Sequence, residues 1–190
     1  MKNVKIKSIA FIAAVSLAFT VSASDLLKDG KKMLKDGYDS TGVPAVEEVR
    51  MPIHSTFKAS VEIYEQYHKK AFANAAYQNF YKSVEGKDEA EVKDIFNALS
   101  KENQAEIMKV NEANDEISSS IGTLLTELLI QQLAFKNMNM TSVLSGLSMW
   151  DMPSALGAFK GTGSELLFIN DSIGEIYRIS EILEAQQTAV

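Results

Sequence analysis

A glutamate and a histidine one helical turn apart come nearest to a reactive pair in this sequence. Glu65 and His68 are three residues apart, so a helix presents both side chains on one side. Glu-x-x-His is half of the di-iron site of ferritin-like bundles, which needs a second such pair and two further glutamates. The only other histidine is His54, and position 51 is methionine, so the second pair is missing. We therefore expect His68, which falls on an apolar stripe, to be a buried or interfacial histidine.

Other metal and haem sites are poorly supplied with ligands. The chain has two histidines and no cysteine, whereas a structural zinc site usually takes four histidine or cysteine ligands. Without cysteine there is no c-type haem attachment, thiol chemistry, disulfide or iron–sulfur cluster. Asp29, Asp36 and Asp39 do not follow the spacing of a calcium-binding loop and are expected to be solvated turn residues. We expect neither a metal nor a cofactor.

Signatures of nucleophilic catalysis and nucleotide binding are also missing. The sequence has no Gly-x-Ser-x-Gly, and the serines around Ser145 have no histidine near them. Gly161-Thr162-Gly163 lacks the third glycine and the preceding strand of a dinucleotide fingerprint, so it is interpreted as a boundary between two helices. Glu127 stands in an apolar run but beside the inner face, which favours a partly exposed carboxylate over a buried acid. We expect no catalytic residue and a protein that is not an enzyme.

The N-terminus has the three parts of a secretory signal peptide. Three lysines within the first seven residues precede an apolar stretch, 9–19, and small residues follow at 21–23. The apolar stretch is much shorter than the ~20 residues that a helix needs to span a bilayer. We therefore predict that 1–23 is a cleaved signal peptide, removed after Ala23, rather than a membrane anchor.

Cleavage would leave an acidic chain. The formal net charge is −6, and three of the basic residues lie in the signal peptide, so residues 24–190 carry −9. Such a chain gains nothing from the electrostatic attraction that drives nucleic-acid binding or adsorption to anionic lipid. An exported chain without disulfides must be stabilised by packing, which favours a bacterial periplasmic or secreted protein. We expect a protein partner or self-association, and no nucleic acid.

Hydrophobic periodicity predicts an all-α protein with three long helices. Apolar residues recur at three- and four-residue spacing, and no segment alternates as a strand does. The connection at Gly86 and Lys87 is so short that the first two long helices must be antiparallel neighbours. The sequence thus predicts an elongated antiparallel helical bundle. Its long helices are expected at 53–84, 88–137 and 164–187.

The remaining segments are expected to be short helices and a connector. The N-terminal segment, 24–52, is predicted to contain a short helix and a connector, ahead of a bundle domain that spans 53–190. Further short helices are expected in 141–160. Asn103 and Asn114 fall on the inner face, where polar residues fix pairing. The apolar residues that the periodicity places inside are Phe57, Val61, Tyr64, Phe72, Ala75, Ala76, Phe96, Leu99, Ile107, Val110, Ile117, Ile121, Leu124, Leu128, Phe135, Leu166, Ile169, Ile173, Ile176 and Leu183.

The stretch 117–159 has only three charged residues in 43. Its apolar side chains must be buried in a core, a partner or a membrane. The first half follows a heptad pattern, but from Met138 onward there is no regular apolar face. Methionine adapts to varied partners, and a lone tryptophan is a good anchor. The candidate interaction surface is therefore Met138, Met140, Met149, Trp150 and Met152, with closure of the bundle core as the alternative explanation.

Two functions of different classes fit this sequence. The first is a non-enzymatic protein that acts through protein–protein contact. The alternative is a membrane-active helical protein, pore-forming or lipid-inserting, that uses 117–159. The first 19 residues of 117–159 carry one charge, and their length as a helix is close to that needed to span a bilayer. However, they include a glutamate, two glutamines and three serines, which make a poor lipid-spanning helix. Carriage of a small apolar ligand ranks last, because alanines in the first long helix allow close helix approach.

Overall fold

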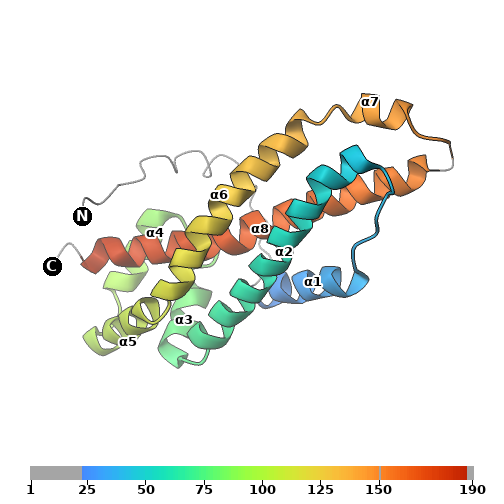
Figure 1. Cartoon of the computed structure of the whole chain (residues 1–190). Helices are drawn as coiled ribbons and strands as arrows, with labels where there is room; N and C mark the ends of the chain where they lie inside the picture. Colours follow the sequence, from blue (N-terminus) through green and yellow to red (C-terminus); the bar gives the residue numbers. More distant parts are fainter. Residues whose placement is uncertain (1–22, 150, 188–190) are drawn as a thin grey trace.

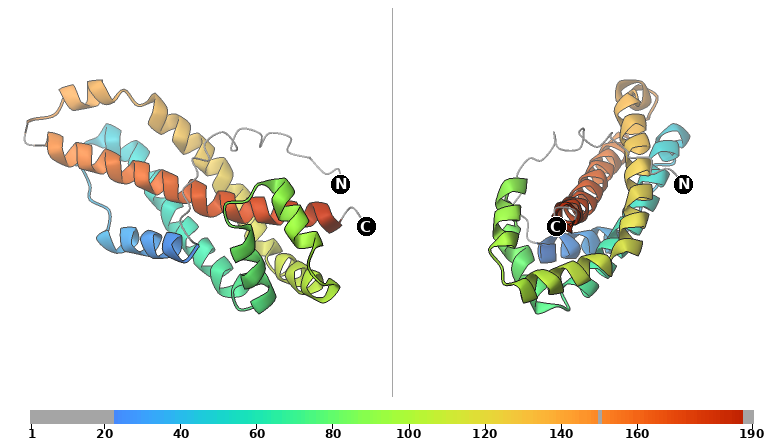
Figure 2. Two further views of the ribbon diagram at one scale, coloured as in Figure 1. Left: turned by 180° about the vertical axis from the view of Figure 1, so that it is seen from behind. Right: turned by 90° about the vertical axis from the view of Figure 1, so that its left-hand side faces the viewer.

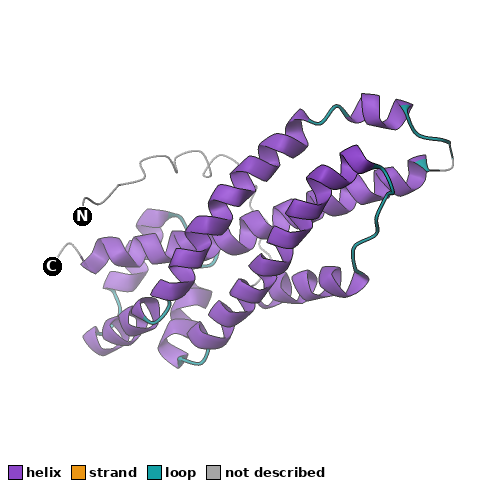
Figure 3. Cartoon of the chain, viewed as in Figure 1, coloured by secondary structure: helices purple, strands orange, loops and turns teal. Residues whose placement is uncertain are grey.

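The computed structural model describes residues 23–149 and 151–187, and all regular secondary structure in them is helical (Figure 1; Figure 3). The prediction of an all-α protein is confirmed for this part of the chain, which contains eight helices and no strand. They are α1 (Ala23–Asp36), α2 (Pro44–Ala71), α3 (Ala75–Val84), α4 (Glu89–Asn97), α5 (Lys101–Glu112), α6 (Asp115–Asn137), α7 (Met140–Ser145) and α8 (Met152–Gln187).

Helices α2, α6 and α8 pack against one another, and the shorter helices lie at the two ends. Figure 1 shows α3, α4 and α5 gathered where α8 ends, with α7 at the opposite end. The two views of Figure 2 show the same arrangement from behind and from the side. We call α3, α4 and α5 the α3–α5 lobe. The distal end is α7 with the adjoining ends of α6 and α8.

The inner faces predicted from periodicity form the main core. Phe57 of α2 and Phe168 of α8 meet edge to face with ring centroids 5.3 Å apart, and Tyr64 meets Phe168 in the same way at 6.3 Å. Thirteen of the twenty apolar residues that the periodicity placed inside are buried. Six are partly buried, namely Phe72, Ala76, Leu99, Val110, Phe135 and Leu166. Ala75 is exposed, as is Asn103, so the expected inner positions of these two residues are wrong. A second, smaller core at the distal end consists of Val46, Ala155 and Phe159, against which Phe135, Met138, Val143, Leu144 and Leu147 pack.

The first predicted long helix, 53–84, is wrong as one element. Its N-terminal part begins at Pro44, inside the predicted connector, because the fixed φ of proline suits the first turn of a helix. The helical path then breaks before α3. Asn74 caps α3 by accepting a hydrogen bond from the backbone N–H of Tyr77 at 3.0 Å. The helical pattern of 53–84 is therefore divided at an asparagine cap, although no glycine or proline lies within it at that point.

The second predicted long helix, 88–137, is also wrong as one element, because it forms α4, α5 and α6. Its start is as expected: Asp88 and Glu91 form a reciprocal capping box. Ser100 caps α5, and the side-chain amide of Gln104 donates to three carbonyl oxygens at the end of α4 at 3.0–3.3 Å. These local bonds stabilise the breaks and let the lobe fold back against α8.

The last helix is longer than predicted. It starts at Met152 rather than 164 and runs through Gly161-Thr162-Gly163 without a break, so the expected boundary there is wrong. Thr162 is buried, donates to the carbonyl of Ala158 at 3.0 Å and accepts from Arg50 Nε at 3.1 Å. Long-range packing therefore keeps this segment helical despite the poor helix propensity of glycine. Of the short helices predicted in 141–160, α7 is separate and the second is the start of α8.

The helix breaks before α3 and before α6 lie at the same level. The side-chain amide of Gln131 in α6 donates to the hydroxyl of Thr56 at 2.7 Å and to the carbonyl of Pro52 at 3.3 Å, both in α2. If this antiparallel register of α2 and α6 is continued toward the lobe, Asn114, which directly precedes α6, lies level with Ala71, the last residue of α2. Asn114 is 2% exposed, and its amide has no hydrogen-bond partner within the described residues. A buried unpaired amide costs about 1–3 kcal/mol, so these paired breaks are a weak point.

Helix α1 approaches α8 through a glycine. A Cβ on Gly30 would lie 2.4 Å from Cε2 of Phe168, whose ring is itself buried between helices. The close approach explains a glycine in the middle of a helix, where it would otherwise cost about 1 kcal/mol relative to alanine. In contrast, a Cβ on Gly161 in α8 would meet nothing within 4 Å.

We predict opposite effects for alanine at these two glycines. Gly30→Ala should lower the free energy of unfolding by about 1–3 kcal/mol, because the Phe168 ring must move out of its packed position. Gly161→Ala should raise it by up to about 1 kcal/mol through helix propensity alone. Urea unfolding followed by circular dichroism measures both. Equal stabilisation by the two substitutions would contradict the close approach of α1 to α8.

Candidate functional site

Glu65 and His68 each contact neighbouring side chains within the fold. Glu65 pairs with Lys31 of α1 at 2.8 Å and with Lys69 at 2.9 Å, and these hydrogen bonds lower its pKa to about 2. The ring of His68 stacks on Phe72 with centroids 4.2 Å apart, and burial lowers the pKa of His68. Among the described residues, no three histidine, aspartate or glutamate side chains are close enough to hold a metal ion. The pair belongs to the packing between α1, α2 and the aromatic residues beside them.

The densest polar cluster joins the connector before α2 to the helices behind it. Glu47 of α2 accepts hydrogen bonds from the backbone N–H and the hydroxyl of Thr41, each at 2.7 Å, and from the hydroxyl of Tyr38. Burial acts to raise the pKa of Glu47, but these hydrogen bonds and the charge of Arg50 outweigh it and lower the pKa below its usual 4.5. Burial, with the bond to Glu47, raises the pKa of Tyr38 to about 12.

Arg50 completes this cluster from the next turn of α2. Its Nη1 donates to the carbonyl of Asp39 at 2.9 Å and to Glu47 at 3.3 Å, and its Nε donates to Thr162 of α8. The guanidinium carbon lies 4.6 Å from the centroid of the Tyr38 ring, a cation–π contact. Arg50 is therefore a buried charge with a carboxylate, an aromatic ring and two oxygen acceptors around it. We call Tyr38, Thr41, Glu47, Arg50 and Thr162 the connector clamp.

His54 extends the clamp toward the middle of α8. Its Nδ1 lies 2.5 Å from Oε1 of Glu165, and its ring centroid lies 4.8 Å from that of Tyr38. A histidine–carboxylate pair also occurs in hydrolases, where the carboxylate orients the ring. Here the polar groups around it bond to one another across three segments of the chain. We interpret the clamp and this pair as a fastening of the connector to α2 and α8, not as a reaction centre.

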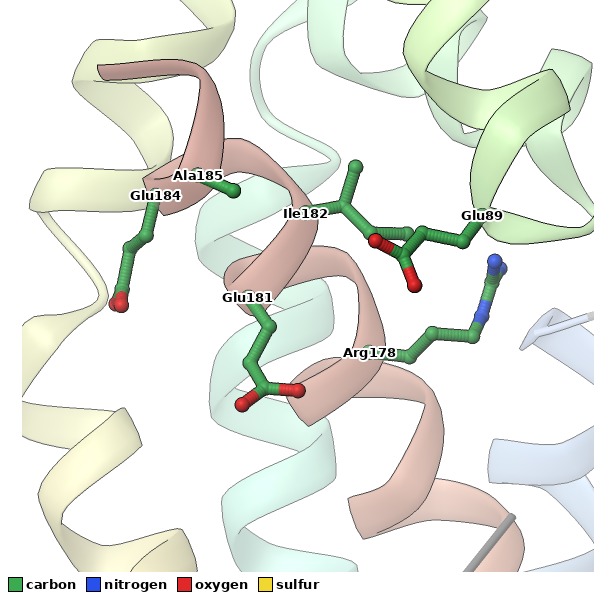
Figure 4. Close-up of a pocket in the computed structure, with 6 residues that line it drawn as sticks. All are labelled: Glu89, Arg178, Glu181, Ile182, Glu184 and Ala185. Atoms are coloured by element: carbon green, nitrogen blue, oxygen red, sulfur yellow. The ribbon is translucent and has the colours of Figure 1, made fainter. Parts of the chain in front are cut away.

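Two grooves lie at the end of the molecule that contains the α3–α5 lobe. The first, of about 480 Å³, is lined by the end of α8 and by Glu89 of α4. Figure 4 shows the carboxylates of Glu181 and Glu184 pointing away from Glu89 and Arg178, so the charged groups do not converge on one point. The second, of about 530 Å³, is mainly apolar and has polar side chains only from Asn79, Ser83 and Asn103. Neither arrangement has a nucleophile beside a base.

The five residues of the predicted interaction surface have different surroundings at the distal end. Met138 packs against the second core, and Met152 is partly buried. Met149 is 80% exposed. Met140 begins α7, but the environment of its side chain is not described. Trp150 lies outside the described residues. Met149 is therefore the member of this set that faces solvent in the described part of the distal end.

The outer face of α6 is the largest feature that sequence reasoning missed. Leu129, Ile130 and Leu133 are 48%, 65% and 59% exposed, although they belong to a helix whose other side is buried in the core. Thr126 lies one turn before them, and its hydroxyl donates to the carbonyl of Gly122 at 3.0 Å, so this polar group is already satisfied. We call Thr126, Leu129, Ile130 and Leu133 the outer stripe of α6.

Charged side chains stand beside the outer stripe but not in it. Glu127 is exposed, and its Oε2 accepts from the hydroxyl of Thr56 at 3.3 Å, so the expectation of a flanking carboxylate is confirmed. Lys136 is exposed near the end of α6. A surface helix ordinarily has charged residues on its solvent side. An apolar stripe with a polar border is instead typical of an interaction surface.

Charge is distributed unevenly along the molecule. Residues 117–164 contain two acidic and two basic side chains and are therefore neutral. Residues 85–116 carry a formal charge of −6, and residues 165–187 carry −4. The acidic segments meet where α4 and α5 pack against α8, while the neutral segment forms most of α6, α7 and the start of α8 (Figure 1). Acidic charge is thus concentrated at the end of the molecule that contains the α3–α5 lobe, and residues 117–164 add no net charge.

Comparison with known protein families, curated proteins and solved structures finds no match. No helix in the described ranges, 23–149 and 151–187, is long and apolar enough to cross a membrane.

The connector clamp predicts a specific dependence of stability on pH. Folding lowers the pKa of Glu47, so its ionised form stabilises the fold above about pH 4.5, and this contribution is lost as the pH falls through the lower folded-state pKa. Glu47→Gln should therefore lower the free energy of unfolding at pH 7 by about 1–3 kcal/mol. The difference from the wild type should shrink in acid.

Urea unfolding at pH 7 and at a series of lower pH values tests this prediction. Glu48→Gln is the matched control, because it removes the same charge from the neighbouring exposed position. A loss of stability that is equal for both variants, or independent of pH, would contradict the assigned role of Glu47.

Proposed function

We propose that this chain is an exported, non-enzymatic helical protein that acts through protein–protein contact. The observation that carries the proposal is the outer stripe of α6, where three large apolar side chains face solvent without a charge among them. Exposing these side chains costs free energy that a partner would recover on covering them. The polar clusters described above bond within the fold, which leaves this surface as the best candidate for a function.

The proposed contact surface continues from α6 toward the distal end. Met149 is more exposed than Leu129, Ile130 or Leu133, and its flexible thioether side chain suits an adaptable contact. The predicted surface of Met138, Met140, Met149, Trp150 and Met152 is retained here as the border of this contact. Met138 contributes by supporting the second core beneath it.

The fold acts as a support for this surface. We describe it as an elongated antiparallel bundle whose three long helices are α2, α6 and α8. Burial of Ile121, Leu124 and Leu128 fixes the rotation of α6 about its axis, so Leu129, Ile130 and Leu133 must face outward. The proposed signal peptide, 1–23, precedes most of the described fold, and cleavage after Ala23 would give a periplasmic or secreted protein.

A protein partner suits the outer stripe better than a lipid bilayer does. The stripe is one helix face wide, with Glu127 and Lys136 beside it. The acidic charge of the rest of the chain opposes approach to anionic lipid. Membrane insertion through 117–159 is therefore treated as an outcome of the test below.

Site-directed crosslinking in cells that export the protein tests the proposed function. The chain has no cysteine, so Ile130→Cys introduces a single thiol into the outer stripe. With a short thiol-to-amine crosslinker, we expect this variant to give a discrete protein adduct on a denaturing gel. Lys82→Cys, an exposed position on α3 outside the proposed surface, is the matched control and should give none.

Three results would overturn this proposal. The first is the absence of an adduct from Ile130→Cys, and the second is equal crosslinking from both positions. The third is dye release from vesicles of neutral or anionic phospholipid by the purified wild-type protein that Ile130→Glu abolishes. That last result would assign the stripe to membrane contact.

A further inference from the structure

We infer that the partner of the outer stripe is a second copy of this chain, with the two α6 helices packed antiparallel about a two-fold axis beside Leu129 and Ile130. This inference rests on the proposed function and specifies its partner. A two-fold contact uses the same patch on both copies, so the patch must fit itself in shape and in charge. The outer stripe meets both requirements.

The stripe is small at one end and bulky at the other. Toward the N-terminus of α6 it has Thr126, with Gly122 one turn before it, and toward the C-terminus it has Ile130 and Leu133. With the axis beside Leu129 and Ile130, Leu133 of one copy lies level with Thr126 of the other. A bulky side chain then meets a small one, which is how helix surfaces interdigitate.

Polar groups do not oppose this packing. The hydroxyl of Thr126 already donates to the carbonyl of Gly122 within its own helix, so covering it leaves no unpaired donor. A Cβ on Gly122 would meet nothing within 4 Å, so the space beside it is open to the partner. Asn137 of the second copy lies level with this glycine, at the exposed edge of the contact.

The flanking charges also fit this register. On a helix of 3.6 residues per turn, Glu127 and Lys136 stand on opposite sides of the stripe. In the proposed register Glu127 lies level with Gln132 of the other copy, and Lys136 lies level with Thr123. The two Glu127 side chains stand on the same side of the contact, offset by about five residues or roughly 7.5 Å, and the two Lys136 are offset by about 13 residues, so no like charges lie directly opposite each other.

The overall charge selects the antiparallel orientation. The start of α6 is joined to the α3–α5 lobe, where residues 85–116 carry −6. In the antiparallel register the two starts of α6 are roughly 44 Å apart along the helix axes, a distance equal to the rise of about 29 helical residues. This separation exceeds the screening length of ~8–10 Å at physiological salt. A parallel pair would place both acidic lobes side by side.

Size-exclusion chromatography with light scattering tests whether the purified wild-type protein dimerises. We expect a concentration-dependent dimer. Ile130→Glu should weaken it roughly 30-fold or more, the loss typical of a central interface residue. Leu167→Glu is the matched control, because this residue of α8 is 59% exposed and lies outside the stripe, and it should dimerise as the wild type does.

Cysteine crosslinking of purified protein tests the orientation. Ile130→Cys should crosslink to itself with a short bis-maleimide. Gly122→Cys should not, because its two copies lie about 15 residues, or roughly 22 Å, apart along the helices. A mixture of Gly122→Cys and Asn137→Cys chains should give a crosslinked heterodimer. Self-crosslinking of Gly122→Cys would instead show a parallel pair and overturn the antiparallel arrangement.

Light scattering of the purified protein and crosslinking in cells together distinguish self-association from contact with a different protein. If the purified protein is monomeric at every concentration but Ile130→Cys gives an adduct with a different protein in cells, self-association is overturned and the interaction role stands. If the protein is monomeric and no adduct forms in cells, both are overturned. Dimerisation that persists unchanged in Ile130→Glu would overturn the assignment to α6.

Discussion

The ring of Phe168 lies where three helices meet, and the rest of the structure depends on that packing. It contacts Phe57 and Tyr64 of α2 edge to face, and the backbone of α1 approaches it at Gly30. The chain has no disulfide to hold these helices together, so burial of such side chains must stabilise the fold. This packing also fixes α8 as the element against which α2 and α6 are placed.

The three- and four-residue spacing was sufficient to predict the all-α class and the buried faces. Burial of Ile121, Ile169 and Ile173 follows directly from that pattern. The helix boundaries were harder to predict, because the breaks depend on caps and on packing. Asn74 and Ser100 end helical patterns that have no glycine or proline at those points. Conversely, Thr162 stays helical between two glycines because Arg50 reaches it from 112 residues away.

The candidate site was only partly predictable for a related reason. Low charge identified 117–159 as unusual, but composition does not say which side of a helix is covered. That depends on how α6 is rotated against α2 and α8. The rotation places Leu128 inside and Leu129 outside, although the two residues are adjacent and of the same type. The clamp between Arg50, Glu47 and Thr162 depends likewise on contacts that sequence spacing alone does not specify.

Uncharged surface and acidic surface have complementary effects in this molecule. A strongly acidic body keeps copies apart in solution, whereas a neutral strip allows approach in one orientation only. A neutral strip on a neutral body would favour contact in many orientations and would promote aggregation. In the proposed dimer, the charge of the α3–α5 lobe would therefore contribute to specificity at a surface that it does not touch.

The paired helix breaks beside Asn114 have a consequence for how the chain opens. The lobe continues into α2 and α6 through two short junctions at one level, and one of these contains an unpaired buried amide. Segments joined in this way exchange their amide hydrogens as a unit, at a lower free energy than the global unfolding. Amides of α3, α4 and α5 should therefore lose protection together, ahead of those in the middle of α2 and α8.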